Sequence, residues 1–445
     1  MKHLLLISVA VFLCAVAPAQ ATEIKEIISP KGIKAWLVED HKLPLISMQF
    51  AFRGGVERDP ADKQGLANLT MNLMTEGAGP YDAAAFQQQL ADHSVALKFE
   101  AGRDALEGSI KALSQDKDTA FDLLHLAVTQ PHFDAVEFSR HRDQQLSALR
   151  TMFGNPEWQG RYALFQNVFG KHPYGARRLG STQTLANITR ADVKSFAASH
   201  LARDNLVLSV AGDISPRELG VALDKIFGGL PKHAKFVPIS EVVWPHDKAV
   251  ILLPREGTQT NLLFAMPGPK RDDKDWYAAE IANYILGGGG FSSRLMQDVR
   301  DKKGLTYGIN MGISPMEHGS LILGEAATDN PKTGQAWEVI SDTMRRFYDD
   351  GVSEKEVDGA KDYLTGALPL AMTSTDKISE VLEGIQLEHL SRDYLDRRND
   401  LLRKVTVEQV NQAVRRWFNP DGLFISMVGK PEGMAPTQTE DLVRY

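Results

Sequence analysis

A short amphipathic helix near the start of the chain carries amides where metal ligands could stand. In KQGLANLTMNLM, residues 63–74, Asn68 and Asn72 are four residues apart and share a helix face, with Met71 beside them. Two imidazoles and a glutamate at this spacing bind zinc and activate water. Amides are poor zinc ligands and a thioether accepts no proton, so this helix cannot do that chemistry. The opposite, apolar stripe is formed by Leu66, Leu69 and Leu73.

A pair of hydrogen-bond donors lies in VRDKKGLTY, residues 299–307. Arg300 is always charged and Tyr307 is a neutral hydroxyl donor, so the two side chains suit the stabilisation of an oxyanion. A surface arginine and a packed strand tyrosine would show the same spacing. The spacing alone leaves both interpretations open.

Four consecutive glycines, at positions 287–290, precede this segment. Glycine permits positive φ and close backbone approach. A phosphate-binding loop is excluded because neither Gly-Lys-Ser/Thr nor a βαβ unit accompanies the glycines. The simplest interpretation is a flexible turn between helices, formed by Gly287, Gly288, Gly289 and Gly290.

The other candidates for chemistry are weaker. Glu137 and His141 are four residues apart in a predicted helix, but such pairs are common on solvated faces, and we expect a surface pair. The twelve histidines include no H-x-x-x-H pair. The segment His172-Pro173-Tyr174-Gly175 is predicted to be a structural turn without chemistry.

An internal repeat shows how the elements that position these residues are organised. Residues 188–212 match residues 405–429 at a constant offset of 217 (406 − 189 = 217; 429 − 212 = 217). The matching pairs are Thr189/Thr406, Val193/Val410, Asp204/Asp421, Leu206/Leu423, Ser209/Ser426 and Gly212/Gly429. Each copy predicts an N-capped helix followed by a strand that alternates between apolar and other positions.

The repeat predicts two homologous halves. We place the first at residues 22–228, a proline-containing linker at 229–248, and the second at 249–445. Each half opens with strands joined by turns and groups its long helices elsewhere. This order predicts an α+β fold in which each half is a largely antiparallel sheet packed by helices.

The N-terminus predicts export. Residues 1–21 contain Lys2, an apolar run and Ala19-Gln20-Ala21, as in a cleaved signal peptide. The run is shorter than the roughly 20 residues of a spanning helix. The only cysteine, Cys14, would leave with this signal, so we expect a periplasmic chain without disulfides and without a membrane anchor. The net charge of −7 argues against nucleic acid as a partner.

Three segments together resemble one family. The helix at 63–74 resembles the opening helix of the insulinase, pitrilysin and processing-peptidase family of zinc metallopeptidases, the inverzincins. HPYGARRLGSTQTLANIT, residues 172–189, and LGGGGFSSRLMQDVRDKKGLTYGI, residues 286–309, resemble two further signatures of that family. With the repeat, the resemblance covers nearly all of the chain after residue 21.

The resemblance implies that the zinc site is degenerate. Laid on the family motif, the two histidines fall on Asn68 and Asn72, the catalytic glutamate falls on Met71, and the third zinc ligand falls on Ala148. All four roles are lost together. We therefore expect no metal and no other cofactor in this chain.

The resemblance also implies a partner. Arg300 and Tyr307 match a pair that, in active members, hydrogen-bonds the substrate carbonyl and the oxyanion. The chain would be the non-catalytic subunit of a heterodimeric zinc metallopeptidase that hydrolyses peptides, and zinc would sit in a homologous HxxEH subunit. The glycines at 287–290 would help to admit substrate, although the family's loop is longer.

Two alternatives remain open. One is a catalytically inert peptide-binding or scaffold protein of the same fold, and a neighbouring gene for an HxxEH homologue would argue against it. The other is a self-sufficient hydrolase, which has little support because no G-x-S-x-G motif and no cysteine nucleophile occur after residue 21.

Overall fold

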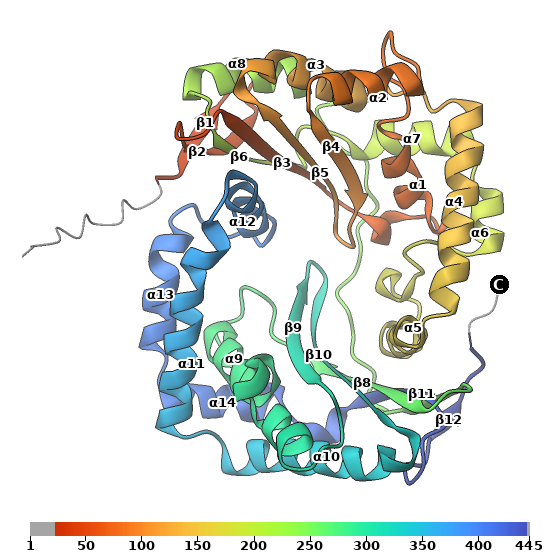
Figure 1. Ribbon diagram of the computed structural model, residues 1–445, viewed down its shortest axis with the longest axis vertical. Coiled ribbons are helices and arrows are strands. Elements are labelled where there is room, and N and C mark those ends of the chain that lie inside the picture. The colour runs from red at the N-terminus through yellow and green to blue at the C-terminus, as the bar shows by residue number, and fades with distance from the viewer. Residues whose placement is uncertain (1–22, 443–445) are drawn as a thin grey trace, which may run out of the picture.

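Two six-stranded sheets, one from each half of the chain, lie at opposite ends of the molecule (Figure 1). The computed structural model describes residues 23–442. The first sheet has the order β1-β2-β6-β3-β5-β4 and the second the order β12-β7-β11-β8-β10-β9. Only the pairs β2–β6, β7–β11 and β7–β12 are parallel among these described strands. The predicted fold of two largely antiparallel α+β halves is confirmed.

The strands of the first sheet are β1 (Lys25–Ile28), β2 (Lys34–Glu39), β3 (Leu45–Arg53), β4 (Ala96–Ala101), β5 (Ala105–Leu113) and β6 (Leu206–Gly212). Those of the second are β7 (Val250–Pro254), β8 (Gln259–Pro267), β9 (Ile309–Met316), β10 (Gly319–Asp329), β11 (Phe424–Gly429) and β12 (Gln438–Thr439). The central strands of the two sheets, β6 and β11, are the strands that correspond to each other in the sequence repeat.

Each sheet packs with helices of its own half, some of which cover its outer side while others run along the flanks of the molecule (Figure 1). In the first half these are α1 (Leu66–Leu73), α2 (Ala83–Asp92), α3 (Lys117–Thr129), α4 (Ala135–Phe153), α6 (Thr182–Asn187), α7 (Arg190–His200) and α8 (Pro216–Phe227). In the second they are α9 (Trp276–Asn283), α10 (Thr333–Asp350), α11 (Glu354–Ala367), α13 (Tyr394–Lys404) and α14 (Val407–Trp417). Thr189 and Thr406 cap α7 and α14 through capping boxes, which confirms the repeated N-cap.

The halves exchange one helix each across the molecule. Helix α5 (Pro156–Phe169) belongs to the first half but packs on β8 and β11 of the second sheet. Helix α12 (Thr375–Leu387) belongs to the second half but packs on β3 and β6 of the first sheet. The two helices correspond under the repeat, because an offset of 217 carries residue 158 of α5 to residue 375 (158 + 217 = 375), the first residue of α12. The exchange is therefore symmetric.

The exchange explains why both faces of these strands are buried. The two alternating strands predicted from the repeat are present, and all but the first residue of β6 and every residue of β11 are buried. Both strands are central, with helices of their own half on one face and the exchanged helix on the other. An alternating sequence therefore fills a fully buried strand, because Ser209 and Ser426 are small enough to lie under a helix.

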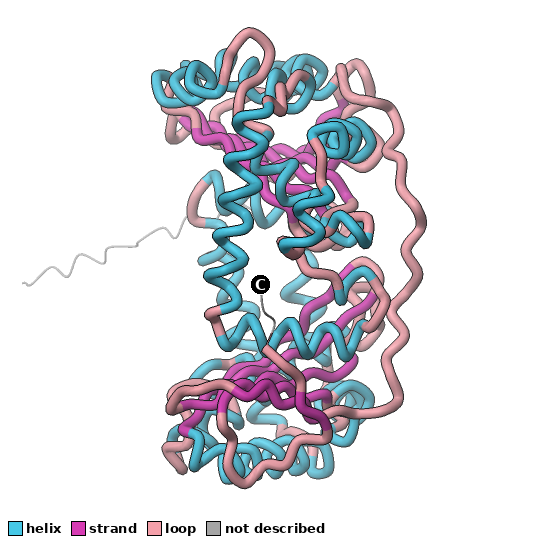
Figure 2. The backbone as a smooth tube through the Cα atoms, turned by 90° about the vertical axis from the view of Figure 1, so that its right-hand side faces the viewer, coloured by secondary structure: helices cyan, strands magenta, loops and turns pink. Residues whose placement is uncertain are grey.

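The connection between the halves runs along the outside of the molecule. Residues 231–249 form no helix or strand and are part of the long loop at the right of Figure 2. Backbone hydrogen bonds fasten it to the first half at Lys235 and to the second at Val242. The predicted signal peptide, with Cys14, lies outside the described residues. Between residues 23 and 442, no helix is long and apolar enough to cross a membrane.

We predict that the exchange contributes strongly to stability. Leu164 of α5 is fully buried against the second sheet. Leu164→Ala should lower the free energy of unfolding by about 2–5 kcal/mol, because it leaves a cavity between the halves. The control Val136→Ala, at an exposed position of α4, should change it by less than about 0.5 kcal/mol. Equal effects in urea titrations would contradict this role for α5.

Candidate functional site

The N-terminus of α1 is fixed by a buried carboxylate. Asp59 accepts hydrogen bonds from the backbone amides of Gly65, at 2.7 Å, and Ala67, at 2.8 Å. Gly65 has φ 95°, and a Cβ there would lie 2.7 Å from the Leu179 carbonyl oxygen, so only glycine fits. Burial raises the pKa of Asp59 to about 7, against the lowering effect of those two amides. Gln145 of α4 donates to the Gly65 carbonyl at 3.0 Å and holds the same end.

The four degenerate zinc positions offer no metal ligand. Met71 is 2% exposed and packs in the core of the first half. Asn68 is half-buried and Asn72 is exposed, and Asn72 Nδ2 donates to Asn68 Oδ1 at 3.1 Å. Ala148 lies on the exposed side of α4. Two amides bonded to each other therefore stand where the family motif has a pair of imidazoles.

A charged cluster joins the C-terminal end of α1 to α4 close by. Glu76 follows α1, and its Oε1 lies 2.8 Å from Nε2 of His141. Arg140 donates to Glu76 Oε2 at 2.6 Å and to Glu137 Oε2 at 2.7 Å. We call Glu76, Glu137, Arg140 and His141 the α1–α4 joint. Glu137 and His141 are less exposed than a solvated surface pair, at 19% and 13% for their side chains.

The joint has the donor types of a metal site but already contains a cation. Ligand atoms of Glu76, Glu137 and His141 lie within 4.8 Å of one another. The guanidinium of Arg140 donates to both carboxylates, so each has a charged hydrogen-bond partner without metal. Sequence reasoning did not include Glu76. Glu76 lies three residues beyond the last residue of α1, so helical spacing gave no signal for it.

Arg300 and Tyr307 differ in exposure, because Arg300 is half-buried and Tyr307 is exposed. Arg300 lies in a wide helical turn, Met296–Asp301, with its guanidinium 4.7 Å from the ring centroid of Phe291. No carboxylate within residues 23–442 forms an ion pair with Arg300. The side chain of Tyr307 is 84% exposed. Its backbone is held by the neighbouring Thr306, whose Oγ1 lies 2.7 Å from the Ala327 carbonyl oxygen.

The four glycines form a packed turn rather than a free loop. Gly287 and Gly288 end the wide turn Tyr284–Gly288, which continues α9. A Cβ on Gly287 would lie 2.8 Å from Cβ of Met311 in β9. Gly289 would meet the Tyr284 carbonyl oxygen at 2.8 Å, and Gly290 has φ 55°. The glycines thus allow close approach to β9 and present Phe291 beneath Arg300. A substrate contact at these glycines stays a prediction.

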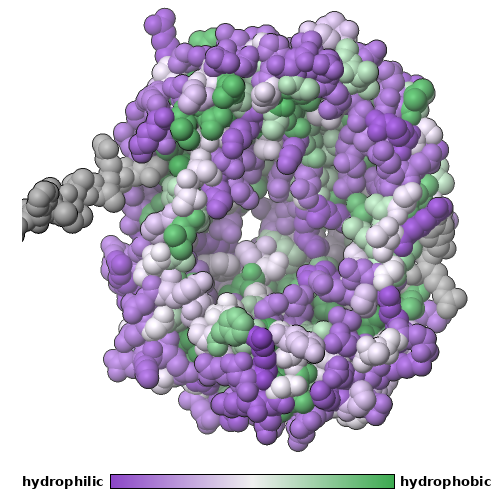
Figure 3. Space-filling model, viewed as in Figure 1, coloured by the Kyte–Doolittle hydropathy of each residue, from purple (hydrophilic) through white to green (hydrophobic). Residues whose placement is uncertain are grey.

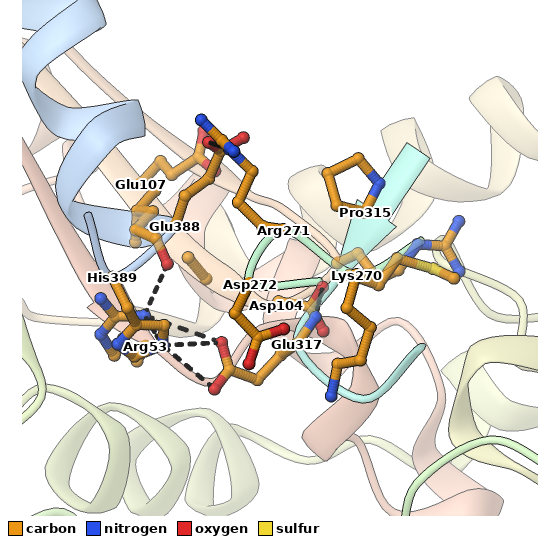
Figure 4. A pocket seen from close by; sticks show the side chains of 14 residues that line it. Arg53, Asp104, Glu107, Lys270, Arg271, Asp272, Pro315, Glu317, Glu388 and His389 are labelled. Atoms are coloured by element: carbon orange, nitrogen blue, oxygen red, sulfur yellow. Dashed lines mark hydrogen bonds and ion pairs between the residues drawn. The ribbon is translucent and has the colours of Figure 1, made fainter. Parts of the chain in front are cut away.

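A cleft of about 460 Å³ lies where the two halves meet (Figure 4). Arg53 of β3 donates to the Leu387 carbonyl at 2.9 Å, at the end of α12. His389 Nε2 lies 3.0 Å from Arg53 Nη1 and 3.2 Å from the carboxylate oxygens of Glu317. The cleft is therefore lined by polar contacts between the halves.

The HPYG segment lies beside this cleft and has a structural task that the sequence did not reveal. Tyr174 is buried, and its hydroxyl donates to Asp104 Oδ1 at 2.5 Å while accepting from the backbone amide of His318 at 2.9 Å. Asp104 belongs to the turn after β4, and His318 to the turn between β9 and β10. Tyr174 thus ties a turn of the first sheet to a hairpin of the second.

The fold and the degenerate helix define a class: a metallopeptidase-like protein that lacks the family's metal ligands. Residues 37–181 match the family model described as insulinase, peptidase family M16. Residues 187–364 match the model described as the peptidase M16 inactive domain. The chain belongs to the insulinase family, peptidase family M16, and is an inactive-type member of it.

Named relatives agree with that assignment. A crystal structure of a peptidase M16 inactive domain from Pseudomonas fluorescens superposes with a TM-score of 0.86 at 28% identity, covering 95% of this chain and 100% of the other. The non-peptidase homolog YmxG of Helicobacter pylori is 25% identical over 75% of this chain and 77% of its own length. The periplasmic protease PqqL of Escherichia coli shares the fold, with a TM-score of 0.77 at 15% identity over 93% of this chain and 46% of its own.

We predict that Glu76 holds α1 against α4. Glu76→Gln should lower the free energy of unfolding by about 1–3 kcal/mol, because it leaves Arg140 and His141 without their shared charged partner. The matched control is Glu157→Gln, which breaks the exposed Glu157–Arg161 pair and should cost less than about 0.5 kcal/mol. Urea titrations of both variants measure the difference, and equal stability of Glu76→Gln and wild type would contradict the role.

The α1–α4 joint is also expected to work without metal. Chelator or added zinc should leave the thermal midpoint unchanged, because Arg140 already occupies the place of a cation. Differential scanning calorimetry with and without zinc checks this. A zinc-dependent rise in the midpoint that His141→Ala abolishes would show that the joint is a metal site.

Proposed function

We propose that this chain is the non-catalytic subunit of a two-chain zinc metallopeptidase and completes the partner's active site in trans. One observation carries the proposal: every zinc-binding and water-activating position is lost, while Arg300 and Tyr307 are both retained, Tyr307 exposed and Arg300 without an ion pair to any carboxylate within residues 23–442. A chain that had lost its role in hydrolysis altogether would have no need to present this pair.

The chemistry of the pair fits a role on a partner's substrate. Peptide hydrolysis passes through a tetrahedral oxyanion, which donors aimed at the developing charge stabilise. The guanidinium of Arg300 lies over the ring of Phe291 and makes no ion pair that would have to break. The hydroxyl of Tyr307 is exposed. Both groups can therefore meet a carbonyl group that another chain presents.

The shape of the molecule supports peptide binding. Figure 3 shows its face hollowed at the centre, between the two halves. We call this hollow the central chamber. Strands β4 and β9 are edge strands of the two sheets, and an extended peptide can add to such an edge through main-chain hydrogen bonds. The proposed substrates are accordingly peptides, and the turn at residues 287–290 would help to admit them.

In this proposal the partner supplies the zinc site that this chain lacks. It is a homologous chain with an HxxEH helix, and it binds the zinc. We place the complex in the periplasm, on the basis of the signal-like residues 1–21 and the existence of a periplasmic relative of the same fold. Nucleic acid has no place in this proposal.

A second function is a catalytically inert peptide-binding or scaffold protein. The name of the Helicobacter pylori relative, a non-peptidase homolog, favours it. On that account Arg300 and Tyr307 are remnants of ancestry, and their replacement changes no reaction. The two functions therefore differ in a measurable quantity.

We predict that Arg300 and Tyr307 support turnover by the complex. In a reconstituted pair, Arg300→Ala or Tyr307→Phe in this chain should each lower kcat for a peptide by roughly 10²–10³, the effect of removing one oxyanion donor. Assembly, measured by size-exclusion chromatography, should be unchanged. The matched controls are Arg397→Ala and Tyr363→Phe, which alter exposed side chains elsewhere in the second half. Full activity of the Arg300 and Tyr307 variants would leave only the scaffold function.

A further inference from the structure

The two exchanged helices contact their sheets through different kinds of side chains. Helix α5 meets the second sheet through an apolar interface, in which Leu164 and Val168 pack with Leu263, Phe424 and Val428. A Cβ on Gly160 of α5 would lie 2.7 Å from Cδ1 of Leu263, so the helix and sheet are closely packed. The polar contacts of α5 with the second half, Arg161 to Glu325 at 3.2 Å and Asn167 to Glu440 at 2.9 Å, give both carboxylates a partner.

Helix α12 meets the first sheet through both an apolar edge and a row of polar side chains. Thr375 Oγ1 lies 3.1 Å from Ser47 Oγ, and Gln386 Nε2 donates to Ser209 Oγ at 2.7 Å. Its apolar contacts lie along one edge and involve Ile378, Leu382 and Ile385 against Trp36, Val38 and Ala211. The polar contacts run along the other side of the helix.

Glu383 lies within this polar stripe and has no counter-charge. Its residue is 6% exposed, and its Oε1 is buried without a hydrogen-bond partner. Spacings of four and three residues place it on the same helix face as Ser379 and Gln386. A buried carboxyl can stay neutral at modest cost, but a buried unpaired carboxylate is strongly unfavourable.

The charged groups on the elements around α12 do not neutralise Glu383. On β3, Arg53 is engaged by the carbonyls that end α12 and by Glu317. On β5, Lys111 is paired with Asp376 at 3.1 Å. The charged residues of β2 are Lys34 and Glu39, at its two ends, and those near the C-terminal end of α12 are Glu388 and His389. Strand β6 and the turn Leu368–Met372 carry no charged residue.

Two further carboxylates oppose the ionisation of Glu383. Glu107 lies on β5, directly opposite Glu100 of β4 in the strand register, and Glu380 is one turn before Glu383 on α12. Burial first, and then the negative charges of Glu107 and Glu380, raise the pKa of Glu383 to about 8. The carboxyl is thus neutral at neutral pH and ionises under mildly alkaline conditions.

Clefts flank both ends of α12. At its N-terminal end, a cleft of about 1020 Å³ is lined by His41, Lys111 and residues 372–376. At its C-terminal end lies the cleft of about 460 Å³ that Arg53, Leu387 and His389 line (Figure 4). The helix is therefore the element that separates two hollows on the inner side of the first sheet.

We propose that α12 is a releasable wall of the central chamber: ionisation of Glu383 undocks it from the first sheet and joins the two flanking clefts into one groove. Helix α5 stays docked, so the two halves remain attached. The released groove exposes a polar floor that includes Ser47 and Ser209, which α12 covers in the closed state. This property belongs to the chain alone and does not depend on the proposed function.

The test is hydrogen exchange on the intact protein from pH 6.5 to 9.5, with rates corrected for the intrinsic pH dependence of exchange. The protection of α12 should fall by up to about tenfold per pH unit below pH 8, where undocking releases one proton, and should level off above pH 8, where Glu383 is ionised in both states. The protection of α5 should not change over the same range and serves as the internal reference. Constant protection of α12, or a parallel loss in α5, would overturn the proposal.

Variants assign the effect to one carboxyl. Glu383→Gln keeps the shape and stays neutral, so α12 should remain protected through pH 9.5. Glu380→Gln, on the exposed side of the same helix, keeps the Glu383 carboxyl and should retain the pH-dependent loss, with its midpoint moved slightly to lower pH because one opposing charge is removed. A Glu383→Gln protein that loses protection as wild type does would contradict the assignment.

If that variant does not fold, Glu107→Gln decides the assignment. Removing its charge should move the loss in α12 to lower pH, and an unchanged midpoint would count against Glu383.

Discussion

The exchange of α5 and α12 is the constraint on which the rest of the structure depends. A six-stranded sheet with buried central strands needs cover on both faces, and each half supplies only one side from its own helices. The exchanged helix of the other half covers the second face of each sheet. Neither half can therefore bury its own sheet alone, and the two sheets are held facing each other at a fixed separation. The central chamber and its clefts are consequences of that arrangement.

The degenerate site shows how a helix pair can be joined without a metal. In the family motif the ligands come from α1 and α4, so a bound ion links the two helices. Here Asp59 and Gln145 hold the start of α1, and Glu76 connects its end to Arg140 and His141. The framework of the site is thus kept by hydrogen bonds and ion pairs while its chemistry is lost. A framework preserved in this way can continue to shape the chamber wall.

Much of the fold was predictable from local pattern. The repeat, the capping threonines Thr189 and Thr406 and the order of strands and helices gave two α+β halves. The exchange could not be predicted, because the sequence of α5 shows that one helix face is apolar but does not show which sheet that face packs against. For the same reason the alternation in β6 and β11 does not show that both faces of the strands are buried. Ser209, a small polar residue, lies under a helix from the other half.

The candidate site divides in the same way. The absence of zinc ligands at Asn68, Asn72 and Ala148 follows from the residue types at these positions, so the sequence alone predicts it. The burial of Glu383 and the contacts of Tyr174 depend on partners at least 70 residues away or on another element, and local spacing does not indicate them. Contacts between residues far apart in the sequence decide which polar side chains are buried and what they bond to. Only the folded structure shows these contacts.

The central claim is that this chain works beside a zinc-binding homologue. The most direct measurement is to recover the tagged protein from the envelope of its native host, identify its companions by mass spectrometry, and assay the eluate for chelator-sensitive peptide cleavage. The account predicts a companion that carries HxxEH, and activity that neither chain shows alone. A chain that emerges by itself, zinc-free and inert, would contradict it and leave a binding or scaffold role.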